Sequence, residues 1–220
     1  MTSTTVAGQV SAMNASRAGQ PVSDVMKPFL REQQGLASMG KPEGVISVGS
    51  MLPDAALLDP HGEPTRLYDA LGGRLAVIVF YRGAWCPYCN IALRTYQAEL
   101  VPELTRQNVA LIAVSPQAPD GSLSMQQKNE LAFTVLSDPG NALAGRVGIV
   151  SAPSPDALAA QLQLGLDLAA VNADDTPAIP MPTTLIVDPD RVVRWVDIHP
   201  DYTTRSEPAE ILTALDTPIR

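Results

Sequence analysis

The sequence predicts a single α/β domain in which a central mixed sheet is covered by helices on both faces. Residues 75–81 form an unbroken apolar run that ends in two aromatic residues, which is typical of a strand buried on both faces. Behind Cys89, leucine and tyrosine side chains recur three and four residues apart, which is typical of a helix. A chain of 220 residues with 45% apolar residues can bury a sizeable core.

Further apolar segments predict the other strands. Residues 45–70 are expected to form short strands and turns, with His61 at a hairpin tip rather than in a catalytic role. The predicted longer strands are 75–81, 109–115, 133–136, 184–187 and 192–198, the last two forming a hairpin. A polar cluster after the last strand is predicted to be a solvated turn, although loops often carry function: His199, Asp201, Tyr202 and Arg205.

Helices are expected between and after these strands. Pro102 lies inside the predicted cysteine helix and is expected to kink it or to end its first part. Asp138 and Pro139 suit the N-cap and first position of a later helix, and Ser206 suits the N-cap of the last one. The predicted helices cover residues 87–107, 122–131, 139–146 and 206–215.

Two segments are predicted as additions to the domain at 45–220. Residues 1–44 are expected to form an N-terminal helical arm that packs on the domain or on a second subunit of a homodimer. Residues 148–180 are expected to be an insertion whose helix begins at Ser154 and covers a sheet edge or makes a dimer contact. The alternative is a lid that shapes access to Cys86.

Cys86 and Cys89 are the only cysteines, and they lie where the strand 75–81 passes into a helix. Pro87 suits the first helical turn. The free N–H groups and the helix dipole there favour an anion, so a thiol at this place is expected to ionise readily. Because Cys89 follows one turn later, the pair predicts a redox dithiol that closes a disulfide.

Other uses of two cysteines fit the sequence less well. A zinc site needs four ligands, and the chain adds only His61 and His199, which lack the paired spacing of metal ligands. No metal and no other cofactor is therefore predicted. A structural disulfide across so short a loop would restrain the unfolded chain very little. Two inert buried thiols are the third alternative.

The charge of the chain argues against several partners. The formal net charge is −8 and the 15 lysine and arginine residues form no tract, which disfavours nucleic acid and anionic membranes. No stretch approaches the ~20 apolar residues of a membrane span. Residues 1–20 show no secretory signal pattern. A cytoplasmic protein is expected, in which the dithiol is kept mostly reduced.

The segment Trp85-Cys86-Pro87-Tyr88-Cys89 resembles the active site of the thioredoxin superfamily, and its inner Pro-Tyr pair is like that of glutaredoxins. The flanking chain is similar to peroxiredoxins, and the similar segments occur in the right order: Val48–Asp54, Val114–Ser115, Phe133–Pro139 and Leu185–Asp188. The resemblance covers about residues 45–215. It implies a thioredoxin-like fold of the peroxiredoxin type.

The sequence around the two cysteines departs from the peroxiredoxin signature. In that signature a proline, a threonine and a distant arginine surround the peroxidatic cysteine. If Cys89 is taken as that cysteine, the three positions hold, in this order, Arg82, Cys86 and Pro182. The segment 181–183 instead resembles the loop with a cis-proline that faces the cysteines of thioredoxins. The peptide bond before Pro182 is therefore expected to be cis and close to the dithiol.

The resemblance implies a thiol-dependent oxidoreductase, most of all an antioxidant thiol peroxidase that reduces hydrogen peroxide or alkyl hydroperoxides with a thioredoxin-type reductant. One alternative is thiol–disulfide exchange with protein or small disulfides. The absence of the signature residues favours this alternative, because peroxide reduction needs preorganised donors in its transition state. Another is a redox-sensing module whose disulfide gates partner binding. The predicted catalytic residues are Cys86 and Cys89. The predicted supporting residues are Arg82, Trp85, Pro87, Pro182 and Thr183, with Arg82 expected to support the thiolate.

Helix geometry predicts which sulfur attacks. Cys86 is expected to be the nucleophile, because unpaired N–H groups and solvent are both available at a helix start. Cys89 lies one turn further in, where deeper burial is expected to raise its thiol pKa. Cys89 is then expected to resolve the mixed disulfide or sulfenic acid that forms on Cys86.

Overall fold

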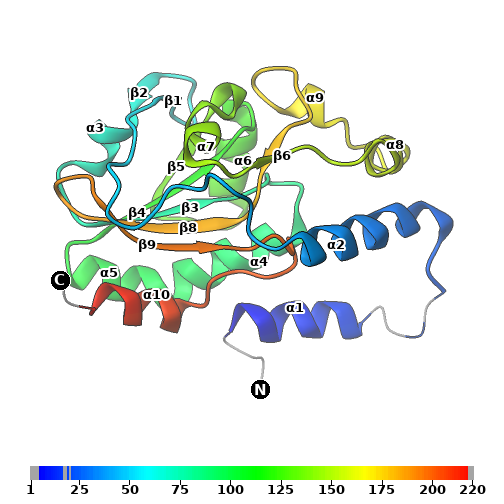
Figure 1. Cartoon of the computed structure of the whole chain (residues 1–220), viewed down its shortest axis with the longest axis horizontal. Helices are drawn as coiled ribbons and strands as arrows, with labels where there is room; N and C mark the ends of the chain where they lie inside the picture. Colours follow the sequence, from blue (N-terminus) through cyan, green and yellow to red (C-terminus); the bar gives the residue numbers. More distant parts are fainter. Residues whose placement is uncertain (1–4, 17–18, 20, 218–220) are drawn as a thin grey trace.

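The computed structural model describes residues 5–16, 19 and 21–217. Its centre is a seven-stranded mixed sheet with the strand order β2-β1-β5-β4-β3-β8-β9 (Figure 1), which confirms the predicted α/β class. A second, two-stranded sheet pairs β6 with β7. The strands are β1 (Ala56–Leu58), β2 (Pro64–Arg66), β3 (Ala76–Phe80), β4 (Ala110–Ser115), β5 (Thr134–Ser137), β6 (Val150–Ser151), β7 (Ile179–Pro180), β8 (Thr183–Val187) and β9 (Val193–Ile198).

Strand β3 lies inside the sheet, and all of its residues are buried, as its apolar run predicts. It runs parallel to β4 and antiparallel to β8, with Phe80 opposite Val114 on one side and opposite Thr183 on the other. Strands β8 and β9 form the predicted hairpin. Tyr81 and Arg82 follow β3, so the chain enters the cysteine segment from a strand held by neighbours on both sides.

Helices cover both faces of the sheet (Figure 1). On one face α1, α4 and α10 pack on Val77, Val79 and Ile186, whereas α3 and α7 pack on Ile78 and Leu185 of the other face. The helices are α1 (Val6–Ala15), α2 (Lys27–Met39), α3 (Leu67–Leu71), α4 (Pro87–Thr95), α5 (Val101–Arg106), α6 (Pro119–Lys128), α7 (Ala142–Val147), α8 (Pro155–Gln163), α9 (Leu168–Val171) and α10 (Pro208–Leu215).

The cysteine helix is interrupted close to where Pro102 predicts it. Helix α4 passes into a π-helical turn, η2 (Tyr96–Leu100), and then into α5. Pro102 lies in the first turn of α5, where its missing N–H is tolerated. The Tyr96 hydroxyl donates to the Ser206 carbonyl at 2.7 Å and so ties the wider turn to the segment before α10.

The first helix of the N-terminal arm joins the core. Val6 and Val10 of α1 are buried in the cluster that contains α4. The carboxylate of Glu207 accepts hydrogen bonds from the backbone N–H groups of Val6 (2.8 Å) and Ala7 (2.7 Å). Glu207 is also the N-cap of α10. The prediction of Ser206 as this cap was wrong, because its buried hydroxyl bonds to other side chains.

Replacing Glu207 by alanine is expected to lower the free energy of unfolding by about 1–3 kcal/mol, because its carboxylate caps two helix N-termini at once. The midpoint of urea unfolding measures this loss. An added protease should also cleave the variant faster than the wild-type protein at sites N-terminal to residue 21. Glu99→Ala, at an exposed glutamate, is the matched control. Equal midpoints for the two variants would show that Glu207 does not anchor α1.

The second arm helix, α2, lies beside α8 of the insertion (Figure 1). None of the α2 residues is fully buried. The two helices are joined by an ion pair between Arg31 and Asp156 at 3.0 Å and by a hydrogen bond from the Ser154 N–H to Glu32 at 2.8 Å. Ser154 also caps α8, as predicted, by accepting from the Ala157 N–H. Helix α2 is therefore held by polar contacts to α8 and by the partly buried Leu36, without a fully buried face.

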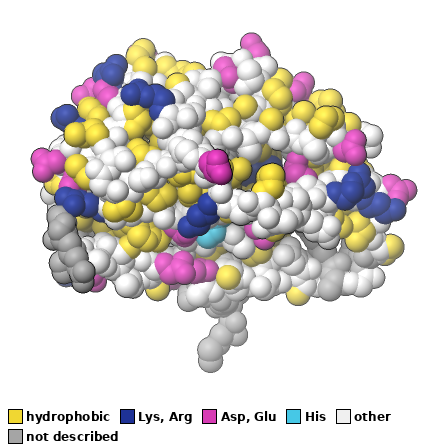
Figure 2. All heavy atoms as spheres, in the orientation of Figure 1, with side chains coloured by type: hydrophobic (Ala, Val, Ile, Leu, Met, Phe, Trp, Pro, Cys, Tyr) yellow, Lys and Arg dark blue, Asp and Glu magenta, His cyan; other side chains and the backbone are white. Residues whose placement is uncertain are grey.

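On the face shown in Figure 2, lysine and arginine side chains alternate with aspartate and glutamate, and no continuous basic stripe crosses it. This agrees with the net charge of −8. Within the described part of the chain, no helix is both long enough and apolar enough to cross a membrane.

Candidate active site

The two cysteines occupy the start of α4. Cys86 is the N-cap residue with an extended backbone, and Pro87 takes the first helical position, as predicted. The Cys86 carbonyl accepts from the backbone N–H of Asn90 (3.1 Å) and from its side-chain amide (2.8 Å), which fixes the first turn. Both cysteines are free thiols, 1% and 0% exposed. The solvent expected at Cys86 is therefore excluded from both sulfurs.

Gly83 makes the turn that brings Cys86 to this place. Its φ of +150° lies in the region that favours glycine. A Cβ at this residue would lie 2.3 Å from Nε1 of Trp85 and 2.9 Å from Cδ of Gln117. The Ala84 N–H donates to the Gln117 side chain. Because Gly83 has no side chain, Trp85 and Gln117 can pack closely against the turn.

A buried arginine contacts the inner sulfur. Nη2 of Arg205 lies 2.9 Å from Sγ of Cys89, and its Nη1 donates to the carbonyls of Tyr202 (2.7 Å) and Thr204 (2.5 Å). Arg205 is 7% exposed. Among the described residues no carboxylate forms an ion pair with it. The prediction of a solvated turn at Tyr202 and Arg205 was wrong, because both are buried against the cysteine helix.

The surroundings shift the pKa values of the two thiols in opposite directions. Burial raises the pKa of the Cys86 thiol well above its ordinary value, and the hydrogen bond to Cys89 raises it further. Burial also opposes ionisation of Cys89, but the hydrogen bond from Cys86 and the charge of Arg205 outweigh it. The pKa of the Cys89 thiol therefore lies well below its ordinary value. Two adjacent thiols cannot both ionise easily, so the charge rests on Cys89.

Arg82 lies on the other side of the dithiol. It is 6% exposed, and its guanidinium carbon is 5.1 Å from the centre of the Trp85 ring and 4.0 Å from that of Tyr202. Its charge lowers the pKa of Cys86, although burial and Cys89 raise that pKa more strongly. Support of the thiolate by Arg82 stays a prediction; its stacking between two aromatic rings is the additional finding.

Tyr202 closes the site from the loop between β9 and α10. Its ring stacks on Arg82 and lies 6.3 Å from the ring of Tyr88, and its hydroxyl donates to the Phe29 carbonyl of α2 at 3.3 Å. A cavity of only about 20 Å³, enough for roughly one water, remains beside Tyr202 and Arg82, with Glu32 of α2 on its wall. Helix α2 of the arm therefore contacts the loop residue that stacks on Arg82.

The predicted proline loop is present but differs in its backbone. Among the described residues there is no cis peptide bond, so the expected cis bond before Pro182 was wrong. Pro182 lines the same cavity as Arg82, and its closeness to the two sulfurs stays a prediction. Thr183 begins β8 opposite Phe80, and its hydroxyl donates to the Met181 carbonyl at 3.0 Å. The trans form is the one that X–Pro bonds favour, by about 0.5–1 kcal/mol, so the bond needs no special support.

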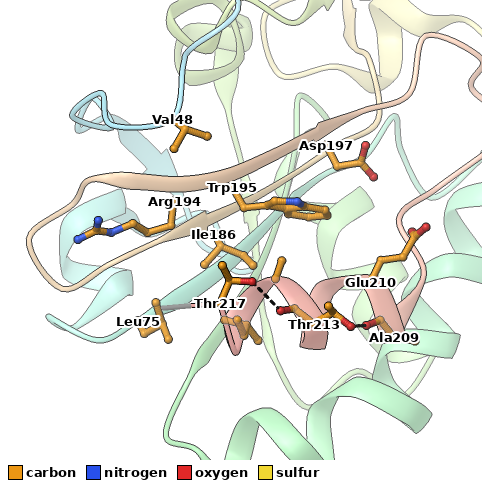
Figure 3. A pocket seen from close by; sticks show the side chains of 12 residues that line it. Val48, Leu75, Ile186, Arg194, Trp195, Asp197, Ala209, Glu210, Thr213 and Thr217 are labelled. Atoms are coloured by element: carbon orange, nitrogen blue, oxygen red, sulfur yellow. Dashed lines mark hydrogen bonds between the residues drawn. The ribbon is translucent and has the colours of Figure 1, made fainter. Parts of the chain in front are cut away.

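A much larger groove lies elsewhere. It measures about 880 Å³ between β9 and α10, and neither cysteine is among its lining residues. Figure 3 shows the Trp195 ring above α10, with Asp197 and Glu210 toward one end. The groove offers no nucleophilic sulfur, so it is separate from the dithiol.

Sequence reasoning missed Arg205 and Tyr202 as site residues. The peroxiredoxin pattern places its arginine before β8, where this chain has Pro182. The only available signal was the polar cluster after β9, a composition that is equally typical of surface turns. Their contacts span more than a hundred residues of sequence, as the separation of Arg205 from Cys89 shows.

Comparisons with known proteins bear on the family and the fold of this chain. The profile of the AhpC/TSA family matches residues 48–196. A putative peroxiredoxin bcp of Haemophilus influenzae is 32% identical over 107 residues, which cover 47% of this chain and 66% of the relative. Peroxiredoxin Bcp of Escherichia coli is 27% identical over 104 residues, covering 47% and 65%. The aligned part thus spans just under two thirds of each relative.

Solved structures show the same fold. Reduced Prx3 of Vibrio vulnificus in complex with hydrogen peroxide has a TM-score of 0.63 at 18% identity and covers 78% of this chain and all of its own. Peroxidoxin BcpB of Mycobacterium tuberculosis has a TM-score of 0.57 at 20% identity, covering 77% of this chain and 94% of its own. These likenesses confirm the expected thioredoxin-like fold of the peroxiredoxin type.

Proposed function

This chain belongs to the AhpC/TSA family, and we propose that it reduces hydrogen peroxide or alkyl hydroperoxides with its Cys86/Cys89 dithiol. A thiolate attacks the peroxide, whose O–O bond breaks. The sulfur becomes a sulfenic acid, and the alcohol or water leaves after taking up a proton. The second thiol attacks the sulfenic sulfur, and a disulfide and water form. A thioredoxin-type dithiol then reduces the disulfide and is itself oxidised.

One observation carries the proposal: two free thiols lie one helical turn apart at the start of α4, and a guanidinium contacts one of them at 2.9 Å. This arrangement supplies a stabilised thiolate and a resolving thiol in one site. Family membership favours peroxide reduction over the two alternatives, disulfide exchange and redox sensing.

The proposal includes a setting and partners. A reducing compartment such as the cytoplasm keeps the dithiol available for the next turnover. Peroxide and a thioredoxin-type reductant are the two substrates. A homodimer stays a prediction.

A coupled assay tests the activity. The purified protein is mixed with thioredoxin, thioredoxin reductase and NADPH, and NADPH oxidation is followed after adding hydrogen peroxide, an alkyl hydroperoxide or a small disulfide. Peroxide-dependent oxidation that scales with protein concentration is expected, and the disulfide should support a slower rate. A faster rate with the disulfide would instead identify a disulfide reductase.

A further inference from the structure

The groove between β9 and α10 has the size of a ligand site. Its volume is about 880 Å³, and pockets that hold small molecules measure about 300–1,000 Å³. The space stays open because several of the α10 side chains on its wall are small: Ala209, Thr213 and Ala214. The helix and the sheet therefore leave a concave surface between them.

Apolar side chains form one part of this wall. Trp195 of β9 is only partly buried, and its ring lies above α10 (Figure 3). Ile186 of β8 and Leu75 before β3 line the same groove. An indole ring offers a ligand a large apolar surface, and the negative charge density on its face attracts a cation. The groove can therefore hold an apolar group and a positive charge together.

Two carboxylates lie toward one end of the groove, Asp197 of β9 and Glu210 of α10 (Figure 3). Oδ2 of Asp197 accepts from His199 Nε2 and from the Ser206 hydroxyl, both at 2.8 Å. Oε2 of Glu210 accepts from the Glu207 N–H at 2.8 Å. Hydrogen bonds within the described chain thus use one oxygen of each carboxylate. The other two, Oδ1 of Asp197 and Oε1 of Glu210, remain for a ligand.

The charge at this end is negative. The hydrogen bond from His199 lowers the pKa of Asp197 more than burial raises it, and the charge of Lys41 adds a smaller lowering, so this carboxyl is ionised at neutral pH. Arg194 is the only lysine or arginine among the described residues of the wall, and it forms an ion pair with Asp188. It therefore does not neutralise the two carboxylates.

We propose that this groove binds a small organic cation, whose ammonium group lies between Asp197 and Glu210 and whose apolar body packs on Trp195. The charge excludes the opposite class of ligand, because a carboxylate or phosphate would face two carboxylates. A neutral apolar molecule would gain contact with the ring but would leave both carboxylates unpaired. This inference concerns a site that the proposed peroxidase chemistry does not use.

The first test compares three probes of similar size on the full-length reduced protein: phenethylammonium, phenethyl alcohol and phenylacetate. Nuclear magnetic resonance follows the indole N–H signal of Trp195, which is assigned by its loss in Trp195→Phe. The ammonium probe is expected to bind at least about tenfold more tightly than the alcohol, through the two carboxylates and the ring. Added salt should reduce this difference, because it screens the charges. Equal affinities of the ammonium and the alcohol, or tighter binding of phenylacetate, would overturn the proposal.

The second test removes one charge and keeps the fold. Glutamine replaces glutamate in a capping box without loss of the cap, so Glu210→Gln should leave α10 intact. The ammonium probe should then bind about three- to tenfold more weakly, and the alcohol should bind as before. Glu63→Gln, at an exposed glutamate outside the groove, is the matched control. Thr213→Trp should fill the groove and abolish the binding of both probes. Wild-type affinity for the ammonium in Glu210→Gln would overturn the role of the carboxylates.

Other occupants of the groove give different results. Sedimentation is measured with and without phenethylammonium, and a dimer that the probe dissociates would assign the groove to a second copy of the chain. Binding that appears only after residues 218–220 are removed would assign it to the end of the chain itself. A blocked phenylalanyl-lysine peptide that binds more than about tenfold more tightly than the free ammonium would assign it to a basic segment of a partner. Each of these outcomes would overturn the small-molecule site.

Discussion

Serine variants of the two cysteines are expected to stop at different stages of the reaction. Cys86→Ser should consume one equivalent of peroxide and then stop as a sulfenic acid on Cys89, because no thiol is left to resolve it. Cys89→Ser should consume almost none, because the remaining Cys86 thiol has a raised pKa and lacks the contact with Arg205. Both should lose steady-state turnover by about a thousandfold or more.

Mass spectrometry separates the attack on peroxide from the resolution step. Each variant is mixed with a slight excess of peroxide and with a reagent that traps sulfenic acids. A trapped adduct on Cys89 in the Cys86→Ser protein is the expected product. An adduct that forms rapidly on Cys86 in Cys89→Ser, with an inert Cys86→Ser, would restore the order predicted from the helix N-terminus. The wild-type protein should give an intramolecular disulfide and no covalent dimer.

Gly83→Ala is expected to lower the free energy of unfolding by about 2–6 kcal/mol, the sum of backbone strain and overpacking. The glycine has a φ of +150°, and the new Cβ would meet Nε1 of Trp85 at 2.3 Å. Displaced Trp85 would carry the start of α4 with it. The peroxidase rate should therefore fall even at temperatures where the variant is folded.

The control for this variant is Gly165→Ala. Gly165 also has a positive φ, +82°, but a Cβ added there would have no described atom within 4 Å. It isolates the backbone cost, of order 1–3 kcal/mol, from the cost of the clash. Urea unfolding of both variants gives the difference. Equal losses would mean that Trp85 and Gln117 move aside freely and that the turn at Gly83 is not tightly packed.

Local features of the chain were predictable from the sequence. The run 75–81 is apolar throughout, so it forms the buried strand β3. Cys86 and Pro87 begin α4 because a proline fits only the first turn of a helix. Pro102 likewise marks the break between η2 and α5. Each of these depends on neighbours within a few residues, and such effects are present in the sequence itself.

Groups that meet across the fold were not predictable in this way. Proline positions do not reveal the state of the bond before Pro182, which is trans. An X–Pro bond favours the trans form by only about 0.5–1 kcal/mol, so the surrounding fold decides between the two forms. The arm was expected to pack on the domain or on another subunit. Helix α1 packs on the domain through Val6, Val10 and the bonds to Glu207, and a contact of the arm with another subunit stays a prediction. Such contacts depend on where the sheet places elements that are distant in sequence.

The sequence by itself determined the dithiol: two cysteines, a proline between them and a strand before them specify a reactive pair at a helix start. Only the tertiary structure decided which sulfur carries the charge. The burial of both thiols removes the advantage of solvent at Cys86. The fold then places Arg205, 116 residues away in sequence, at Cys89. A charge in direct contact outweighs the partial charge of a helix end, so long-range packing selects the thiolate.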